Sequence, residues 1–454
     1  MRTCYCIDMK TFYASVECAE RGLNPFETPL VVADTTRGSN ALCLAVSPKL
    51  KAMGIKNRCR LSEIPSGWNY ITAPPRMQKY IDYAADIYAL YLDYFDPADI
   101  HVYSIDEAFI EATGYLSMYR TDGETLAKHL MGQIAEKLHI PSTAGVGTNL
   151  YLAKIALDIT AKHTKEHIGI LNEQSYRDTL WDHRPLTDFW QIARGTAERL
   201  AHRGIFTMRG IAAVPEELLY KIFGVNAELL IDHAWGRESC LISDIKQYKG
   251  KSKSVSSSQI LPRNYTAAEA ETVLREMAQQ GCRELLKRHV IGKKVTVMVG
   301  YAGEEQPPAQ GSARLSFATA LPSLFVPAAV KAYREAVNPL FPVRRLGICF
   351  CDVTDENAGG YDLFTDWEAM DKEKRGAEAA LQITERFGKN ALLRGTSLKP
   401  EATARERNML IGGHRAGYDD TGGAGEAVHA LRCDEGLTGG TPGPGGAPRP
   451  GGAA

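Results

Sequence analysis

Hydrophobic and polar residues follow two different periods along the first part of this chain. Short apolar runs at 3–7, 30–33 and 41–46 predict β-strands. Between 77 and 95, tyrosines and leucines recur at helical spacing. They predict a helix that packs under the strands, and core residues are the better interpretation than a stacking platform.

Farther along, residues 144–147 predict a strand end, Thr148 an N-cap, and 149–162 a helix. Gly-Val-Gly at 145–147 is a weak phosphate-loop signal, and a tight turn is the favoured interpretation. Short helices with polar joints are expected from 173 to 240.

The part after residue 254 has a clear period of two. Val295, Val297 and Val299 alternate with more polar neighbours, which predicts a sheet with one face packed on helices and the other free. Arg314 and Arg345 fall on the free face, where they either bind a ligand or serve solubility. The predicted order is β-α-β-β-α-β, with strands at 254–261, 293–301, 312–320 and 343–353 and helices at 267–289 and 326–337.

Composition limits the class of protein. A chain of 454 residues is expected to form two to four domains. With 44% hydrophobic and 24% charged residues and no apolar run of membrane-spanning length, we expect a globular, soluble protein with no membrane partner. The first residues do not resemble a secretory signal, so the expected location is cytoplasmic. The net charge of −1 says nothing about partners.

The ten cysteines include no Cys-x-x-Cys pair. They predict reduced, small buried side chains better than a zinc site.

Adjacent carboxylates at Asp106 and Glu107 lie between two β-prone runs, and residues 104–108 are a plausible hairpin tip. Such a pair is either an exposed acidic turn or a cation site, because burying two acids without a cation is costly. Asp8 closes the first predicted strand, where it is either a helix N-cap or a third acid. Three acids and a backbone carbonyl suit two magnesium ions.

Three segments together resemble the signatures of Y-family, or translesion, DNA polymerases: 8–17 (DMKTFYASVE), 104–109 (SIDEAF) and 144–156 (AGVGTNLYLAKIA). The resemblance implies that Asp8, Asp106 and Glu107 are catalytic and hold two Mg²⁺ ions, with a further ligand from the Met9 carbonyl. It also implies that Tyr13, next to Phe12 in the nucleotide site, is the steric gate against ribonucleotides. A core tyrosine is the alternative for Tyr13.

The resemblance extends over about residues 1–353, and the tail resembles the branch known from Gram-positive bacteria and their mobile elements. It implies an α+β, multidomain right-hand polymerase with a ferredoxin-like palm. The implied domains are a palm (1–13 and 80–170), small fingers (14–79), a helical thumb with a helix-hairpin-helix (171–243), a basic linker (244–254), a little finger (255–353) and a tail (354–420). Beyond them, a composition rich in Gly, Pro and Ala predicts a disordered end at 421–454.

In the fingers the chain departs from the family pattern, in which a tyrosine and an arginine bind the triphosphate. Pro48 and Lys51 occupy those positions, so Ser47 and Lys51 are expected to bind phosphate as a hydroxyl and a point charge. Alternatively, Lys49 and Lys51 are only a solvated helix face. Lys162 corresponds to the family's triphosphate lysine, although one extra residue separates it from Asp158.

DNA contacts are expected in three places. Residues 192–205 resemble a helix-hairpin-helix that would bind phosphate near Arg194, Gly195 and Thr196, although Gln191 and Ala193 replace common glycines and a plain αα-hairpin remains open. The open sheet face, with Arg314 and Arg345, is the second place. The third is the serine-rich linker with Lys249, Lys251 and Lys253.

Residues 360–365 resemble a sliding-clamp peptide with Leu363 and Phe364 as anchors, although the usual leading glutamine is absent and a chance Leu-Phe pair is the alternative. Residues 367–387 predict a charged amphipathic helix.

The predicted function is a DNA-templated DNA polymerase of the translesion type, acting in DNA damage tolerance, repair and the SOS response. Its expected partners are primer-template DNA, dNTPs and a sliding clamp, and it is expected to be a monomer. A non-catalytic DNA-binding accessory subunit on the same fold is the alternative, and retention of Asp8, Asp106 and Glu107 argues against it. A palm-fold nucleotidyl cyclase explains the acids but neither the hairpin motif nor the basic linker.

Overall fold

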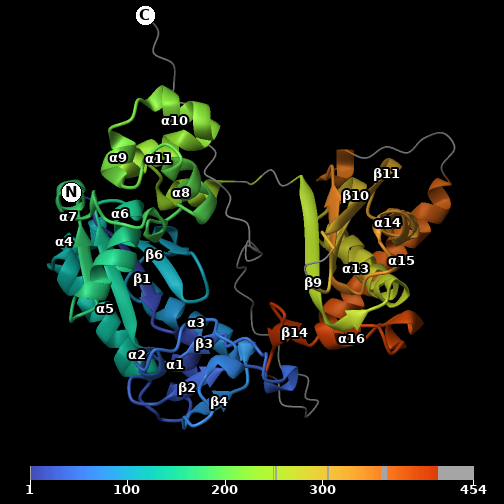
Figure 1. Ribbon diagram of the computed structural model, residues 1–454, viewed down its shortest axis with the longest axis horizontal. Coiled ribbons are helices and arrows are strands. Elements are labelled where there is room, and N and C mark those ends of the chain that lie inside the picture. The colour runs from blue at the N-terminus through green and yellow to red at the C-terminus, as the bar shows by residue number, and fades with distance from the viewer. Residues whose placement is uncertain (1, 249, 251–252, 304–305, 359–365, 418–454) are drawn as a thin grey trace, which may run out of the picture. The chain divides into compact units, whose positions relative to one another are not determined.

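The computed structural model describes residues 2–248, 250, 253–303, 306–358 and 366–417. The chain forms two compact units (Figure 1). Unit 1 is Met1–Tyr248 together with the chain from His414, and unit 2 is Lys249–Gly413.

A five-stranded sheet is the centre of unit 1, in the order β5-β6-β1-β7-β8. Its strands are β1 (Cys4–Met9), β5 (Ile100–Val102), β6 (Glu107–Glu111), β7 (Ser142–Gly147) and β8 (Ile168–Leu171). β1 pairs antiparallel with both β6 and β7 and is almost completely buried. Because side chains alternate along a strand, Cys4 and Cys6 pack on the helix of residues 150–155, while Tyr5 contacts the ring of Phe95 on the other face.

Helices cover both faces of this sheet. The predicted helix at 77–95 is α3, and 149–162 is a composite of α-, π- and 3₁₀-helical turns. The bounds are α1 (Phe12–Ala19), α3 (Met77–Leu92), α4 (Thr113–Tyr119), α5 (Gly123–Leu138), α6 (Leu150–Ile155), the π-helical η4 (Ala156–Thr160) and the 3₁₀-helical η5 (Ala161–His163).

Two sequence predictions about this region are wrong. Asn149, not Thr148, is the N-cap of α6, because its extended backbone lets its side chain accept the Leu152 N–H at 2.8 Å. Gly145 and Gly147 form no tight turn: they lie inside β7, where a Cβ at either position would overlap the backbone of α6 at Ala153. The glycines allow the helix to lie directly on the strand.

A smaller three-stranded sheet, ordered β3-β2-β4, has its own apolar core around Val31, Cys43 and Leu50. It corresponds to the predicted fingers, although the second predicted strand is confined to two residues. Its elements are β2 (Leu30–Val32), β3 (Ala45–Val46), β4 (Ile71–Ala73) and α2 (Pro48–Ala52).

The predicted short helices after residue 173 are present, and most of them share one apolar core that includes Tyr176, Phe189 and Met208, while Ile242 of the last helix packs with Cys4 and Cys6 of β1. They are α7 (Glu173–Leu180), α8 (Arg194–Ala201), α9 (Met208–Ala212), α10 (Glu216–Phe223), α11 (Ala227–Ala234) and α12 (Ile242–Gln247). Further 3₁₀ turns are η1 (Thr35–Arg37), η2 (Leu61–Glu63), η3 (Pro97–Asp99), η6 (Leu186–Asp188), η7 (Gly224–Asn226), η8 (Glu356–Ala358) and η9 (Gly395–Leu398).

Unit 2 has the β-α-β-β-α-β order predicted from the sequence. Its antiparallel sheet is ordered β11-β10-β12-β9, and both helices pack on one face of it around Val297, Phe325 and Phe350. The elements are β9 (Ser254–Tyr265), α13 (Ala267–Lys287), β10 (Val290–Tyr301), β11 (Ala309–Thr319), α14 (Pro322–Ala336) and β12 (Val343–Cys351).

The chain after β12 contains the predicted amphipathic helix and then folds back onto α13. The backbone N–H groups of Thr403 and Ala404 donate to the buried carboxylate of Glu276 at 2.9 and 3.0 Å. These elements are β13 (Thr354–Asp355), α15 (Trp367–Phe387), α16 (Ala404–Arg407), β14 (Leu410–Ile411) and β15 (His414–Arg415).

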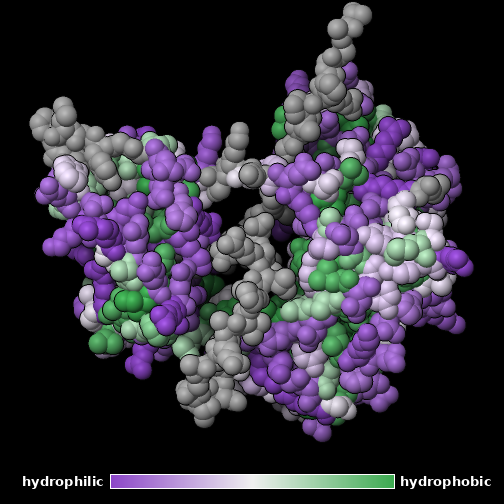
Figure 2. Space-filling view, turned by 180° about the vertical axis from the view of Figure 1, so that it is seen from behind, coloured by the Kyte–Doolittle hydropathy of each residue, from purple (hydrophilic) through white to green (hydrophobic). Residues whose placement is uncertain are grey.

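Hydrophilic residues cover most of the surface visible in Figure 2, and apolar residues lie there in separate patches. Among the described helices, none has the length and apolar character needed to cross a bilayer.

Candidate active site

The three predicted acids lie together at one end of the central sheet. The pairing of β1 with β6 places Asp8 opposite Glu107, so both side chains project from the same face. Asp106 precedes β6, and its carbonyl accepts the Met9 N–H at 2.9 Å, which fixes the two chain segments together. The predicted hairpin is present, since the N–H groups of Tyr103 and Ser104 both donate to the Glu107 carbonyl.

The charges at this end of the sheet are unbalanced. Burial, followed by the nearby charges of Asp106 and Glu107, raises the pKa of Asp8 to about 8. Burial also raises the pKa of Glu107, although Lys154 opposes the effect. Carboxylates that resist ionisation in this way are suited to a hard divalent cation, which would stabilise their charged forms.

Lys154 is a site residue that our interpretation of the sequence missed. From α6, its Nζ donates to Glu107 Oε2 at 2.8 Å and to Asp158 Oδ1 at 3.1 Å. Burial lowers the pKa of Lys154, but the charge of Glu107, together with Cys6 and Asp158, raises it overall. The sequence offered one indication, because Lys154 and Asp158 are four residues apart on a predicted helix, a spacing at which opposite charges can pair.

The contacts of Glu107 bear directly on the predicted metal site. Its Oε1 accepts the Cys6 thiol at 3.1 Å while its Oε2 is held by Lys154. In the part of the chain that the structure describes, no group of three or more His, Cys, Asp or Glu side chains is arranged to hold a metal ion. The donor chemistry fits magnesium, and both Glu107 oxygens already accept hydrogen bonds, from Cys6 and from Lys154.

A second group of cations lies near Asp8. The charge of Lys51 interacts with those of Asp8 and Lys162, and the charge of Lys10 interacts with those of Lys51 and Asp8. Burial is the main reason that the pKa values of Lys10 and Lys51 are lowered. Lys51 is half-buried, whereas Lys49 is exposed. Lys10 was not predicted, and only its place two residues after Asp8 could have indicated it.

Ser47 has a different role from the predicted phosphate contact. It is fully buried, its hydroxyl donates to the Thr28 carbonyl at 2.8 Å, and it accepts the Leu30 N–H at 3.0 Å. It also caps α2 through the Leu50 N–H. Because its only hydroxyl proton is used inside the fold, Ser47 positions α2 and does not face a ligand in this structure.

Tyr13 is half-buried on the first turn of α1 and stacks on Tyr80 of α3, with ring centroids 4.4 Å apart. Phe12 differs, because its side chain is only 2% exposed and belongs to the core. If Phe12 takes part in nucleotide binding, it does so through its backbone.

The extra residue between Asp158 and Lys162 has a structural counterpart. Residues Ala156–Thr160 form a π-helical turn, which contains one more residue than an α-helical turn. The added residue is accommodated within that turn, and the charge of Lys162 still interacts with that of Lys51.

The predicted DNA contacts of unit 1 lie at the start of α8. No side chain caps this helix, Gly195 has no atom near its missing Cβ, and the Arg194 side chain is 90% exposed. Gln191 adopts a positive φ of 69°, the conformation for which glycine is usual. The backbone thus adopts the left-handed conformation despite the absence of a glycine.

The open sheet face of unit 2 bears the other predicted contacts. Arg345 is exposed, and Arg314 is exposed and lies opposite Lys294 in the neighbouring strand. Six of the exposed positions of β9 and β11 are serines: Ser254, Ser256, Ser257, Ser258, Ser312 and Ser316. Lys253 is also exposed. Lys249, Lys251, Leu363, Phe364 and the predicted disordered end at 421–454 lie outside the described residues.

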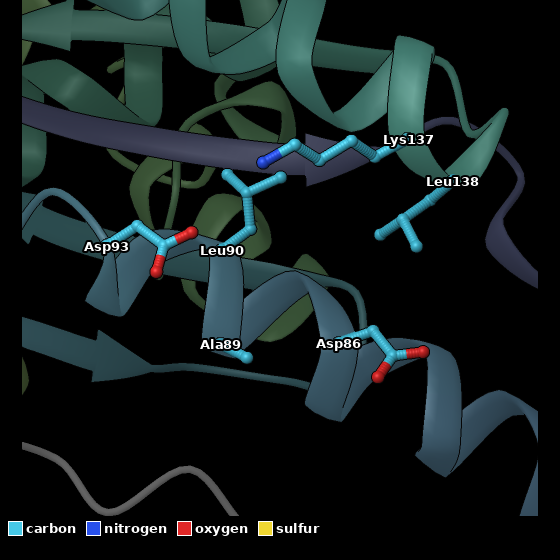
Figure 3. Close-up of a pocket in the computed structure, with 6 residues that line it drawn as sticks. All are labelled: Asp86, Ala89, Leu90, Asp93, Lys137 and Leu138. Atoms are coloured by element: carbon cyan, nitrogen blue, oxygen red, sulfur yellow. The ribbon is translucent and has the colours of Figure 1, made fainter.

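A hollow between α3 and α5 is lined by none of the predicted site residues. Figure 3 shows Asp86, Ala89 and Leu90 on α3 and Asp93 directly after it, with Lys137 and Leu138 approaching from the end of α5.

Comparison with known proteins gives consistent matches. Residues 7–158 match the impB/mucB/samB family and residues 252–363 match its C-terminal domain. The UvrX protein of Bacillus subtilis (strain 168), provisionally named for UV-damage repair, is 31% identical over 90% of this chain and 97% of its own length. DNA polymerase IV 2 of the same organism is also 31% identical, over 90% of this chain and 98% of its own length. A solved Y-family DNA polymerase chimera, Dbh-Dpo4(243-245)-Dbh, has the same fold, with a TM-score of 0.59 and 22% identity over 78% of this chain and 99% of its own.

Proposed function

Since this chain belongs to the impB/mucB/samB family and is a Y-family DNA polymerase of the Gram-positive type, we propose that Asp8, Asp106 and Glu107 are its catalytic acids. The observation that supports this assignment best is the β1–β6 register, which places Asp8 opposite Glu107 while Asp106 is bonded to Met9. The protein acts in DNA damage tolerance, and lesion bypass is the proposed use of its activity.

Two Mg²⁺ ions are the proposed cofactor, held by the three acids and the Met9 carbonyl. When bound, such ions lower the pKa of a primer 3′-OH and stabilise the charge on a leaving pyrophosphate. The protein's own contribution is to hold Asp8 and Glu107 on paired strands, with Asp106 directly before β6, and to provide Lys154 as the counter-charge of Glu107.

We assign nucleotide binding to the lysines near Asp8 and to the ring of Tyr13. Lys10, Lys51 and Lys162 would bind the triphosphate as point charges, since the chain lacks the usual fingers arginine. Tyr13 would lie beneath the sugar and exclude a 2′-OH by steric clash. Ser47 supports α2 and is left out of the proposed contacts.

Primer-template DNA is the proposed partner of α8 and of the open face of unit 2. The uncapped N–H groups at Arg194, Gly195 and Thr196 would bind a phosphate without regard to sequence. Lys253, Arg314 and Arg345, together with Lys294, would contact the duplex backbone, and Lys249 and Lys251 extend the proposed basic linker.

The remaining parts of the proposal rest on the sequence alone. They are the palm, fingers, thumb and little-finger boundaries, the monomeric state, the cytoplasmic location, the link to the SOS response and clamp docking through Leu363 and Phe364. Loss of clamp binding in a Leu363→Ala, Phe364→Ala double variant that still extends short primers would support the docking peptide.

Primer extension by active-site variants tests the catalytic assignment. Asp106→Asn and Glu107→Gln should each reduce dNTP incorporation by orders of magnitude and leave primer-template affinity nearly unchanged. Glu111→Gln is the matched control, because Glu111 lies on the same strand but bonds to Arg2 and Thr113. Comparable extension by parent and active-site variants would exclude the three acids as the catalytic centre.

A further inference from the structure

Four residues near the end of the described chain bind to the fingers and to α3 within unit 1. The carbonyl of Ala416 accepts the backbone N–H of Gln78 at 2.9 Å, and Ala416 is 4% exposed. Gln78 lies in the first turn of α3, a helix whose N-cap residue, Arg76, makes no side-chain cap bond. Residues 414–417, which we call the strap, therefore provide a capping acceptor from 338 positions away in the chain (416 minus 78).

The strap is attached at two further points. Arg415 donates from Nη2 to Thr36 Oγ1 at 3.2 Å and places Nε 3.3 Å from Asp34 Oδ1. Gly417 has a φ of 83°, and a Cβ there would lie 2.7 Å from both Cα and Cβ of Arg76. Only glycine suits this position, because the left-handed backbone and the close approach to Arg76 both exclude a side chain.

Arg76 connects the strap to a buried charge. Its guanidinium binds Glu17 of α1 through two bonds of 2.9 and 3.0 Å, and the Glu17 carboxylate is completely buried. The same carboxylate accepts the Tyr80 hydroxyl at 2.9 Å. Arg21 also pairs with this carboxylate, so Arg76, Arg21 and Tyr80 together satisfy a buried charge that would be very costly if unpaired.

Tyr80 completes the connection, because its ring supports that of Tyr13. A shift in the start of α3 moves Arg76 and, one turn later, Tyr80. The contacts thus run from Gly417 to Arg76, from Arg76 to Glu17, and from Tyr80 to Tyr13.

We propose that the strap is a positioning element for nucleotide selection: it fixes the start of α3 and thereby holds Tyr80 against Tyr13. This inference rests on the proposed role of Tyr13 as the steric gate, and it assigns a function to a segment that follows unit 2 in the chain. None of the strap residues touches the catalytic acids or the proposed triphosphate lysines, so its effect is on binding geometry and not on the chemical step.

Two truncations separate the strap from the residues that follow it. One variant ends at Gly413 and the other at Gly417, so both lack 418–454 and they differ by the strap alone. Hydrogen exchange of the Gln78 amide should be about tenfold faster in the shorter variant, in line with the loss of a cap. The KM for dNTP should rise several-fold with a smaller change in kcat, and the rNTP/dNTP incorporation ratio should also rise. The longer variant should behave as the full chain.

A pair of glycine variants repeats the test without a truncation. Gly417→Ala and Gly413→Ala face the same backbone strain, with φ values of 83° and 82°, but only the former clashes with Arg76, since nothing lies within 4 Å of the site at Gly413. Gly417→Ala should reproduce the KM and ratio changes, and Gly413→Ala should not.

If the Gln78 amide exchanges at the same rate in the two truncated variants, the strap does not cap α3. Suppose that the Gln78 amide exchanges faster in the shorter variant while the KM for dNTP and the rNTP/dNTP ratio are unchanged. If Tyr13→Ala does alter that ratio, this result would show that the strap does not act on nucleotide selection. If kcat and the melting temperature fall together, the strap contributes to stability and not to nucleotide selection. If Tyr13→Ala leaves the ratio unchanged, the gate assignment fails, which is a separate result from the exchange measurement.

Discussion

The ring of Tyr13 lies almost parallel to that of Tyr80, with an angle of 13° between their planes and 4.4 Å between their centroids. One face of Tyr13 is thus supported by a side chain whose hydroxyl is itself anchored on buried Glu17. A supported ring can resist displacement by a bulkier sugar, which a freely rotating ring cannot.

Tyr13→Ala should raise ribonucleotide incorporation by orders of magnitude while deoxynucleotide incorporation falls much less, because the clash with the 2′-OH is removed. Insertion of rNTP and dNTP is measured beside the melting temperature. Tyr80→Phe keeps the supporting ring and removes only its bond to Glu17, so it should relax selection less than Tyr80→Leu, which removes the ring. An unchanged ratio in a destabilised Tyr13→Ala protein would instead identify Tyr13 as a core residue, for which a loss of about 3–5 kcal/mol is typical.

Lys154→Met should destabilise the metal-free protein, because it leaves the buried carboxylate of Glu107 without its cation. Breaking a buried pair typically costs about 3–5 kcal/mol. Added Mg²⁺ should then raise the melting temperature more in the variant than in the parent, since the ion replaces the lost charge. Lys162→Met, which alters an exposed lysine, should show neither effect; equal responses of the two variants to Mg²⁺ would refute the role of Lys154.

Asp8 makes the stability of the metal-free protein depend on pH. Its pKa is about 8 in the folded state against 3.8 without the fold, so the folded protein retains a proton that the unfolded chain loses. Stability should therefore fall as pH rises from about 4 to about 8, by at most about 1.4 kcal/mol per pH unit, and level off above.

Asp8→Asn removes this titration. The difference in unfolding free energy between the variant and the parent should grow in favour of the variant across that range, measured by denaturation in EDTA. Mg²⁺ should diminish the difference, because it stabilises the ionised carboxylate of the parent. A difference that stays constant with pH would show that Asp8 keeps an ordinary pKa.

DNA affinity should decrease steeply with salt, and the triple variant Lys253→Ala, Arg314→Ala, Arg345→Ala should flatten the plot of log K against log salt. Each lost phosphate contact removes a slope of about 0.9 on duplex DNA. Lys331→Ala, on α14 behind the sheet, is the matched control for a lost exposed cation. If the triple variant and Lys331→Ala both keep the slope of the parent protein, the open sheet face of unit 2 does not bind the duplex.

The sequence was informative where chemistry and periodicity coincide. Alternation at Val295–Val299 predicted a sheet with one packed face, and the hairpin at Ser104–Ala108 could be predicted from two acids between apolar runs. Side-chain partners were harder to predict. Ser47 has the residue type of a phosphate contact, and only the fold shows that Thr28 and Leu30 already use its hydroxyl.

Long-range contacts explain the remaining differences. Lys154 becomes a site residue because α6 lies directly on β7, a closeness that Gly145 and Gly147 permit and that no local pattern reports. Ala416 caps α3 although it is far from that helix in the sequence, and its small apolar side chain does not indicate that role.

The π-helical turn at Ala156–Thr160 affects how this sequence should be aligned with its relatives. An alignment that treats the helix as ungapped would place Ala161, not Lys162, at the triphosphate position and would suggest that the lysine is lost. The π-helical turn contains one residue more than an α-helical turn, so it can hold such an extra residue within the helix. An alignment of this chain should therefore allow a gap within the helix.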